Sequence, residues 1–180
     1  MGNCYFPSAN LLIFCDCTEC LSIIFAIFVP IINTKQSDMQ SEKQEILDKR
    51  YLRMATIWAE NSYCLRRKVG AIIVKDQMII SDGYNGTPAG FENVCEDDSG
   101  ITKPYVLHAE ANAITKVARS NNSSDGATLY VTASPCMECA KLIIQAGIKR
   151  VVFNELYRIA DGIDLLRRAG VECLHVADLK

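Results

Sequence analysis

The chain has 180 residues, with 19 basic and 21 acidic side chains, a formal net charge of −2 and nine cysteines. That length fits one ordinary domain plus an appendage, with a single well-buried core. The slight negative charge gives no overall attraction to a nucleic-acid backbone, so it favours a small charged metabolite over a nucleic acid as the partner. Because the cysteine count is odd, a reducing cytoplasm fits better than a disulfide framework.

Residues 1–39 differ in composition from the rest of the chain. Two apolar runs, residues 11–14 and 21–32, are both shorter than the roughly 18 residues needed to span a bilayer, so no membrane partner is expected. No Lys or Arg precedes Lys35, and a secretory signal would need a positive start. We therefore expect an N-terminal extension that is disordered or reflects a misassigned start, with Met39 as the alternative start and residues 40–180 as the working domain.

From residue 40 onward the pattern alternates strands and helices. The residues from Ser41 to Gln44 resemble a capping box and predict a helix start. Four apolar residues then recur at helical spacing and predict its core-facing stripe: Leu47, Tyr51, Met54 and Trp58. Two β-rich runs, residues 69–75 and 78–84, predict a hairpin around Asp76-Gln77.

The second half of the chain supplies the remaining elements. Strands are expected over residues 127–132, 150–154 and 171–176, and helices after His108, after Cys139 and over residues 161–169. Strands that alternate with helices imply parallel crossovers. The sequence therefore predicts an α/β fold of three α/β/α layers, with a five-stranded mixed sheet and helices on both of its faces.

Two motifs in this region combine metal ligands with an acid: His108-Ala109-Glu110 and Pro135-Cys136-Met137-Glu138-Cys139. His108, Cys136 and Cys139 make three zinc ligands, and a catalytic zinc keeps three protein ligands and one open position for water. Bound zinc lowers the pKa of water from about 15.7 to about 7. Glu110, on the first turn of the helix after His108, is placed to move protons without binding the metal.

Other interpretations of these motifs stay open. Cys136 and Cys139 could form a redox pair or half of a structural zinc site, and His108 could be an ordinary capping histidine. A zinc-stabilised binding module would not need Glu110 and would prefer a closed metal site. The combination of His-x-Glu with Pro-Cys-x-x-Cys favours a deaminase, because it is the signature of the zinc deaminases that act on nucleobases.

The region from about residue 51 to residue 176 resembles the deoxycytidylate (dCMP) deaminases of the cytidine deaminase-like superfamily. The matching motifs are Val69-Gly70-Ala71, Gly83-Tyr84-Asn85-Gly86-x-Pro88-x-Gly90, Cys95-x-Asp97-Asp98, His108-Ala109-Glu110-x-Asn112-Ala113-Ile114, Leu129-Tyr130-Val131, Pro135-Cys136-x-x-Cys139-Ala140-Lys141 and Gln145-Ala146-Gly147-Ile148. The resemblance implies a cytidine deaminase-like fold and zinc-dependent hydrolysis of dCMP to dUMP, with release of ammonia, for thymidylate synthesis.

The resemblance also implies roles for individual residues. Glu110 would be the catalytic acid and base. The implied substrate contacts are Asn85 to the deoxyribose, the backbone around Ala109 to the base carbonyl, the backbone near Ser134 to the leaving amino group, and Tyr157-Arg158 to the 5′-phosphate. Arg66 and Arg67 are further candidates for the phosphate. Asn85 could alternatively belong to a plain Asn-Gly turn.

Several members of the family are hexamers that dCTP activates, with Mg²⁺ accompanying the triphosphate. We expect a homo-oligomer between a dimer and a hexamer, because Arg119 corresponds to a family arginine near subunit contacts. The loop of residues 91–105 holds only Cys95, so it cannot build the second, structural zinc site of some phage-type members. The alternative substrates are free cytosine, cytidine, a compound of the riboflavin pathway, and adenosine in transfer RNA. The acidic character of the chain argues against transfer RNA.

Overall fold

A computed structural model describes the backbone of residues 18–157 and 160–179, and the side chains of these residues from residue 38 onward. The chain divides into two compact units, Met1–Gln44 and Glu45–Lys180. Residues 1–17 of the extension expected from the sequence lie outside the described residues. Among the helices that the structure describes, none has both the length and the apolar character needed to cross a membrane.

Helix α1 (Thr18–Ala59) supplies the described backbone of the N-terminal unit and continues into the second unit. It passes through Ser41 without a break, so the prediction that a helix begins there is wrong. A capping box needs its first residue to stand outside the helix, and the backbone before Ser41 is already helical.

The buried stripe of α1 is displaced by one residue from the predicted one, so the prediction is wrong for Met54 and Trp58, although Tyr51 is partly buried and packs against the second core cluster. Met54 and Trp58 are 42% and 38% exposed. The buried residues of this helix segment are Asp48, Leu52, Ala55 and Ala59. The displacement has a physical cause: a charged residue, Asp48, occupies the buried stripe, and a search for apolar residues alone passes over it.

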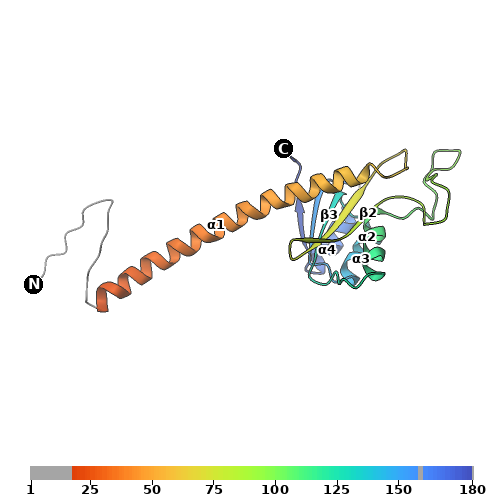
Figure 1. Ribbon diagram of the computed structural model, residues 1–180. Helices are drawn as coiled ribbons and strands as arrows, with labels where there is room; N and C mark the ends of the chain where they lie inside the picture. The colour runs from red at the N-terminus through yellow and green to blue at the C-terminus, as the bar shows by residue number, and fades with distance from the viewer. Residues whose placement is uncertain (1–17, 158–159, 180) are drawn as a thin grey trace, which may run out of the picture. The chain divides into compact units, whose positions relative to one another are not determined.

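A five-stranded mixed sheet forms the centre of the second unit, as the sequence predicts (Figure 1). Its strands are β1 (Gly70–Lys75), β2 (Met78–Tyr84), β3 (Thr128–Ala133), β4 (Arg150–Glu155) and β5 (Glu172–His175). They lie in the order β2-β1-β3-β4-β5. Strand β1 is antiparallel to both of its neighbours, whereas β3, β4 and β5 run parallel. The turn between β1 and β2 has positive φ at Asp76 and Gln77, 49° and 63°, as a two-residue hairpin requires.

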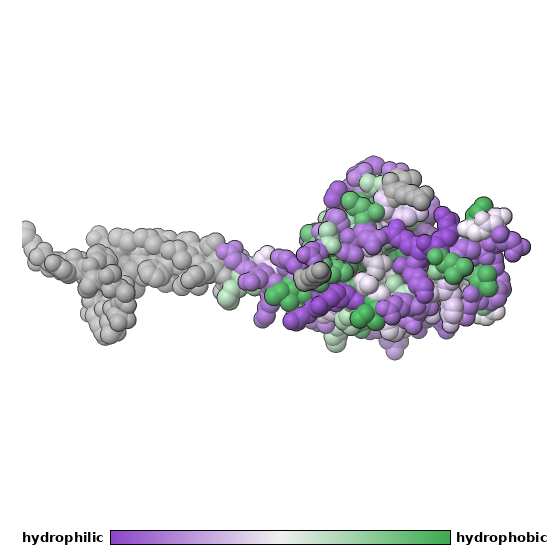
Figure 2. Space-filling model, turned by 90° about the horizontal axis from the view of Figure 1, so that it is seen from above, coloured by the Kyte–Doolittle hydropathy of each residue, from purple (hydrophilic) through white to green (hydrophobic). Residues whose placement is uncertain are grey.

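Different helices cover the two faces of the sheet, because side chains alternate along each strand. Helices α2 (Ala109–Ala118), α3 (Met137–Gln145) and α4 (Asp161–Arg168) pack on one face and form the larger core. Tyr130 of β3 points to the opposite face, where it packs in a second cluster with Leu52 of α1. On the face shown in Figure 2, hydrophobic residues form separate small patches among hydrophilic ones. The three-layer α/β/α prediction is confirmed.

A buried ion pair joins α1 to the sheet. Asp48 is 1% exposed and accepts two hydrogen bonds from Arg150, at 2.8 and 2.7 Å. The hydroxyl of Tyr130 donates a third bond to Asp48 at 2.8 Å. Burial and then this bond to Asp48 raise the pKa of Tyr130, so the phenol keeps its proton as a donor. The network satisfies Asp48 in a position where an unpaired carboxylate would be costly.

Candidate active site

Three metal ligands from two helix starts meet beside the sheet. Nδ1 of His108 lies 3.4 Å from Sγ of Cys136 and 3.3 Å from Sγ of Cys139. All three ligand atoms lie within 4.8 Å of one another. A tetrahedral zinc with Zn–N of about 2.0 Å and Zn–S of about 2.3 Å gives N···S distances of about 3.5 Å. The cluster therefore fits zinc, and it has three members among the described residues, which suits a catalytic site with one open position.

The helices place these ligands and set their charge. His108 is the N-cap of α2 and Cys136 is the N-cap of α3, so two positive helix ends face the same point. Hydrogen bonds from Cys139 and then His108 lower the pKa of Cys136 to about 3. The hydrogen bond with Cys136 in turn raises the pKa of His108. The site thus stabilises a thiolate, which is the form of cysteine that binds metal.

Glu110 lies next to the ligands on the first turn of α2. Its side chain is 4% exposed, and the helix brings it to the wall of the same pocket as His108. Burial raises the pKa of Glu110, because a low-dielectric environment disfavours the charged carboxylate. A carboxyl group with a raised pKa holds a proton more readily than a free one, which suits a group that accepts and returns a proton.

Close packing of α2 against β2 fixes the position of Glu110. A Cβ atom at Gly83 would overlap the carbonyl oxygen of Ala109 and come within 2.6 Å of the backbone nitrogen of Ala113. Only glycine allows the helix to approach the strand so closely. Asn112 strengthens this contact, because its side chain donates to the carbonyl oxygen of Tyr84 at 2.9 Å.

A pocket of about 340 Å³ opens over the ligands and Glu110. This volume lies within the usual range for small-molecule sites, about 300–1,000 Å³. Segments far apart in the sequence enclose it, and its walls include Cys64, Arg66, Arg67, Val69, Asn85, Ala133, Ser134, Cys136, Leu156 and Tyr157. The junction between β3 and α3 forms one side, at the carboxyl end of a parallel strand, where ligands bind in open α/β sheets.

Four of the five substrate contacts expected from the resemblance line this pocket: Asn85, Ala109, Ser134 and Tyr157. The fifth, Arg158, lies outside the described residues. The side chain of Asn85 also has a structural task, since it accepts from the backbone nitrogen of Val69 at 2.8 Å and donates to the carbonyl oxygen of Arg67 at 2.8 Å. The hydroxyl of Ser134 accepts from the backbone nitrogen of Tyr157 at 2.7 Å.

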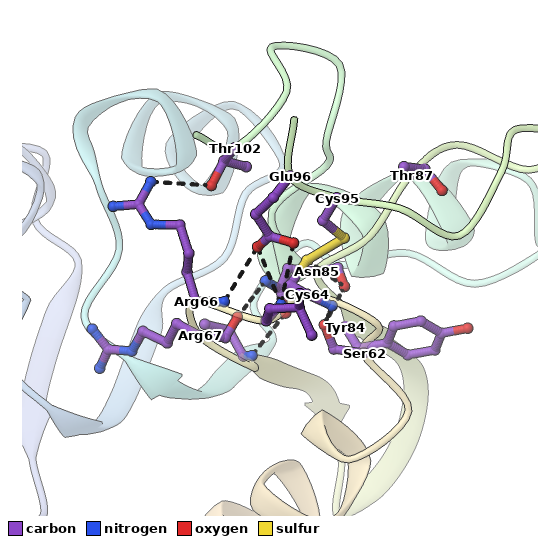
Figure 3. The surroundings of a disulfide bond; sticks show 12 residues. Ser62, Cys64, Arg66, Arg67, Tyr84, Asn85, Thr87, Cys95, Glu96 and Thr102 are labelled. Carbon is purple, nitrogen blue, oxygen red and sulfur yellow. Dashed lines mark hydrogen bonds between the residues drawn. A yellow bond between two sulfur atoms is a disulfide. The ribbon is translucent and has the colours of Figure 1, made fainter. Parts of the chain in front are cut away.

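The sequence did not point to Cys64 and Glu96, which also line the pocket. Cys64 forms a disulfide with Cys95, and the neighbouring Glu96 accepts hydrogen bonds from the backbone nearby (Figure 3). One disulfide among the described cysteines departs from the expectation of a chain without a disulfide framework. The signal was weak, because 31 residues separate the partners and nothing in their spacing pairs them.

Comparison with known proteins places this site in a family. The family model described as "Cytidine and deoxycytidylate deaminase zinc-binding region" matches residues 45–155. The chain belongs to this family. It is 37% identical to the deoxycytidylate deaminase of Enterobacteria phage T4, and the match covers 69% of this chain and 87% of that protein. It is 42% identical to the deoxycytidylate deaminase of Homo sapiens, and the match covers 62% of this chain and 66% of that protein.

A solved structure in the family has the same fold. The dCMP deaminase from the cyanophage S-TIM5, in complex with dCMP and dUMP, matches with a TM-score of 0.71 and 48% identity. The match covers 72% of this chain and 96% of that chain. The resemblance to the dCMP deaminases stated from sequence motifs is therefore confirmed.

Proposed function

We propose that the protein is a zinc-dependent deaminase that hydrolyses dCMP to dUMP and releases ammonia, which supplies dUMP for thymidylate synthesis. The observation that carries the proposal is the cluster of His108, Cys136 and Cys139 beside the buried carboxyl group of Glu110, in a pocket of nucleotide size. Relatives named deoxycytidylate deaminase, and a similar structure in complex with dCMP and dUMP, support this choice of substrate.

The chemistry needs one water and one proton carrier. His108, Cys136 and Cys139 would hold the zinc, which would supply a water activated for attack on C4 of the cytosine. Glu110 accepts a proton from this water and gives it to N3 while the new C4–O bond forms. Glu110 then moves the remaining hydroxyl proton to the exocyclic nitrogen, the C4–N bond breaks, and ammonia leaves. One water is consumed and one ammonia is released, with no change of oxidation state.

The pocket wall supplies the contacts that orient the substrate. In this proposal the backbone around Ala109 binds the base carbonyl, the backbone near Ser134 binds the leaving amino group, and Asn85 binds the deoxyribose. Asn85 keeps a second amide hydrogen and a second lone pair beyond those that it shares with the neighbouring backbone. Tyr157, with Arg158, is proposed to bind the 5′-phosphate.

The finer expectations from the resemblance belong to the same proposal. The protein is proposed to be a cytoplasmic homo-oligomer, between a dimer and a hexamer, whose partner molecules are nucleotides and not nucleic acids. Residues 40–180 are proposed to be the working domain. The enzyme is also proposed to be activated by dCTP, with Mg²⁺ accompanying the triphosphate. Light scattering of purified protein measures the number of subunits. dCMP turnover with and without dCTP and Mg²⁺ measures the regulation.

A panel of substrates tests the reaction. Ammonia release is measured with zinc-loaded protein on dCMP, CMP, deoxycytidine, cytidine and an adenosine-containing stem-loop. The proposal predicts the highest kcat/KM for dCMP. An equal or higher value for cytidine would indicate a nucleoside deaminase, and preference for the stem-loop would indicate a transfer-RNA deaminase. Either result would contradict the proposal.

A further inference from the structure

Helix α4 begins beside the turn that carries the metal ligand Cys136. Gly162 lies in the first turn of α4 and is buried. A Cβ atom on Gly162 would overlap the carbonyl oxygen of Pro135 and lie 2.8 and 2.9 Å from the carbonyl carbon and oxygen of Cys136. The backbone of Gly162 is helical and has no positive φ, so other residues could adopt it. Glycine is therefore required here by the close approach of two backbones.

The peptide group that Gly162 touches also starts helix α3. Cys136 is the N-cap of α3, and its carbonyl oxygen accepts a hydrogen bond from the backbone nitrogen of Ala140 at 2.9 Å. Cys139 lies on the same first turn of α3. A shift of the Cys136 carbonyl group would therefore move both sulfur atoms relative to Nδ1 of His108, which lies 3.4 and 3.3 Å from them. The contact of Gly162 with one peptide group thus reaches two of the three metal ligands.

Helix α4 is held in place on its other side. Ile163 is 3% exposed and Leu166 is fully buried. Both pack in the larger core with Ala140 and Ile143 of α3 (Figure 1). Withdrawal of α4 would open a cavity among these side chains, which is costly in a close-packed interior. Residues 134–136 lie in neither a helix nor a strand, so this turn would yield to a side chain at residue 162.

We propose that Gly162 is a positioning residue for the metal centre. With no side chain between α4 and the turn before α3, the sulfur atoms of Cys136 and Cys139 keep the distances to His108 that a tetrahedral zinc needs. A side chain at residue 162 would change these distances and weaken zinc binding. The inference rests on the zinc site of the proposed function and is independent of which nucleotide the enzyme deaminates.

Gly70 of β1 offers a matched control. A Cβ atom there would overlap the carbonyl oxygen of Ala55 and lie 2.7 Å from the backbone nitrogen of Ala59, both in α1. Ala55 belongs to the cluster on the opposite face of the sheet from the three helices that include α3 and α4. Gly70→Ala and Gly162→Ala therefore add the same methyl group against a backbone, but only Gly162 touches the peptide group of a metal ligand. The comparison separates a loss of stability from a loss of metal binding.

Zinc affinity is the first measurement, by competition with a chromophoric chelator. Gly162→Ala should bind zinc about 10–100-fold more weakly than wild type, the usual effect of changing a residue that orients metal ligands. Gly70→Ala should lose stability but keep the wild-type affinity. Equal affinities in Gly162→Ala and wild type would overturn the proposal, and so would equal losses in the two variants.

Cobalt(II) in place of zinc reports the geometry of the site without any substrate. Its visible absorption bands depend on the arrangement of the thiolate and imidazole ligands, so they change when a ligand moves. The bands should differ from those of wild type in Gly162→Ala and match them in Gly70→Ala. Wild-type bands in Gly162→Ala would show that the glycine does not position the ligands.

A second pair of variants decides the question if Gly162→Ala does not fold. Ile163→Ala shortens a side chain that anchors α4 and gives the helix room to withdraw. Zinc affinity is then compared between Ile163→Ala and the double variant Gly162→Ala/Ile163→Ala. The double variant should bind zinc more weakly, and equal affinity would overturn the proposal. Absence of zinc binding in wild type would overturn the proposed function together with this inference, whereas a zinc-binding wild type isolates the failure to Gly162.

Discussion

His108 Nδ1 and Cys139 Sγ lie 3.3 Å apart although the two residues belong to the starts of different helices. Because this distance is the edge of a zinc tetrahedron, purified protein should contain one zinc per chain. Cys139→Ser should lose most of this metal, whereas Cys173→Ser, at a free thiol outside the cluster, should keep it. Elemental analysis of both variants checks the expectation, and full zinc content in Cys139→Ser would remove that residue from the ligand set.

Glu110→Gln removes the proton carrier but keeps the shape of the side chain. It should retain zinc and lower kcat for dCMP by about 10²–10⁴-fold, the usual contribution of general acid–base catalysis. Glu138→Gln is the control, because Glu138 lies in the second motif but pairs with Lys141 on the surface. Steady-state kinetics on zinc-matched samples measure both variants. Wild-type turnover in Glu110→Gln would disprove the proposed role.

Asp48→Ala tests the buried network between α1 and β4. Without Asp48 the guanidinium of Arg150 loses its buried partner, and the free energy of unfolding should fall by about 3–5 kcal/mol. Glu45→Ala, which removes an exposed ion pair with Lys49 one turn earlier, should cost less than about 1 kcal/mol. Urea denaturation of the two variants gives the comparison. Similar small losses in both would show that the buried pair adds nothing.

Gly83→Ala tests the close approach of α2 to β2. The added methyl group would overlap the backbone of Ala109, so the protein should lose about 1–3 kcal/mol and Glu110 should move. Gly86→Ala, whose Cβ would meet only the Tyr84 ring at 3.9 Å, is the matched control. Thermal unfolding and dCMP turnover are measured together. If both variants unfold at the wild-type temperature, the packing argument fails.

Cys64→Ser tests the disulfide beside the pocket. Opening a link between residues 31 apart should lower the free energy of unfolding by about 2–4 kcal/mol. A reductant should destabilise wild type by the same amount and leave Cys64→Ser unchanged, and denaturant curves with and without reductant measure both effects. If wild type and the variant respond alike, Cys64 and Cys95 do not form the bond in solution.

Sequence periodicity predicted most of the fold because the sheet obeys simple rules. β-rich runs bounded by turn residues gave five strands whose observed ends differ by about one residue from those expected, a normal uncertainty. Helix α1 was harder, because its buried stripe contains Asp48, and only the distant Arg150 explains a charge at that position. Its start was also missed, since a capping box is a local signal and the residues before Ser41 are helical.

The metal cluster could be predicted because its ligands lie in two compact motifs with known spacing. The wall of the pocket formed by Glu96 and the segment around Leu65 could not be predicted from the sequence. The contact between Glu96 and the backbone of Leu65 joins residues 31 apart, and no period or motif links them. The ion pair between Arg67 and Glu155 likewise joins residues 88 apart, which only the folded chain brings close.

The central claim is that water replaces the amino group of dCMP. The most direct measurement is mass spectrometry of the products after zinc-loaded protein is incubated with dCMP in water enriched in heavy oxygen. The account predicts dUMP with one heavy oxygen at C4, together with an equal amount of ammonia. Unchanged dCMP, or dUMP that carries no heavy oxygen, would contradict it.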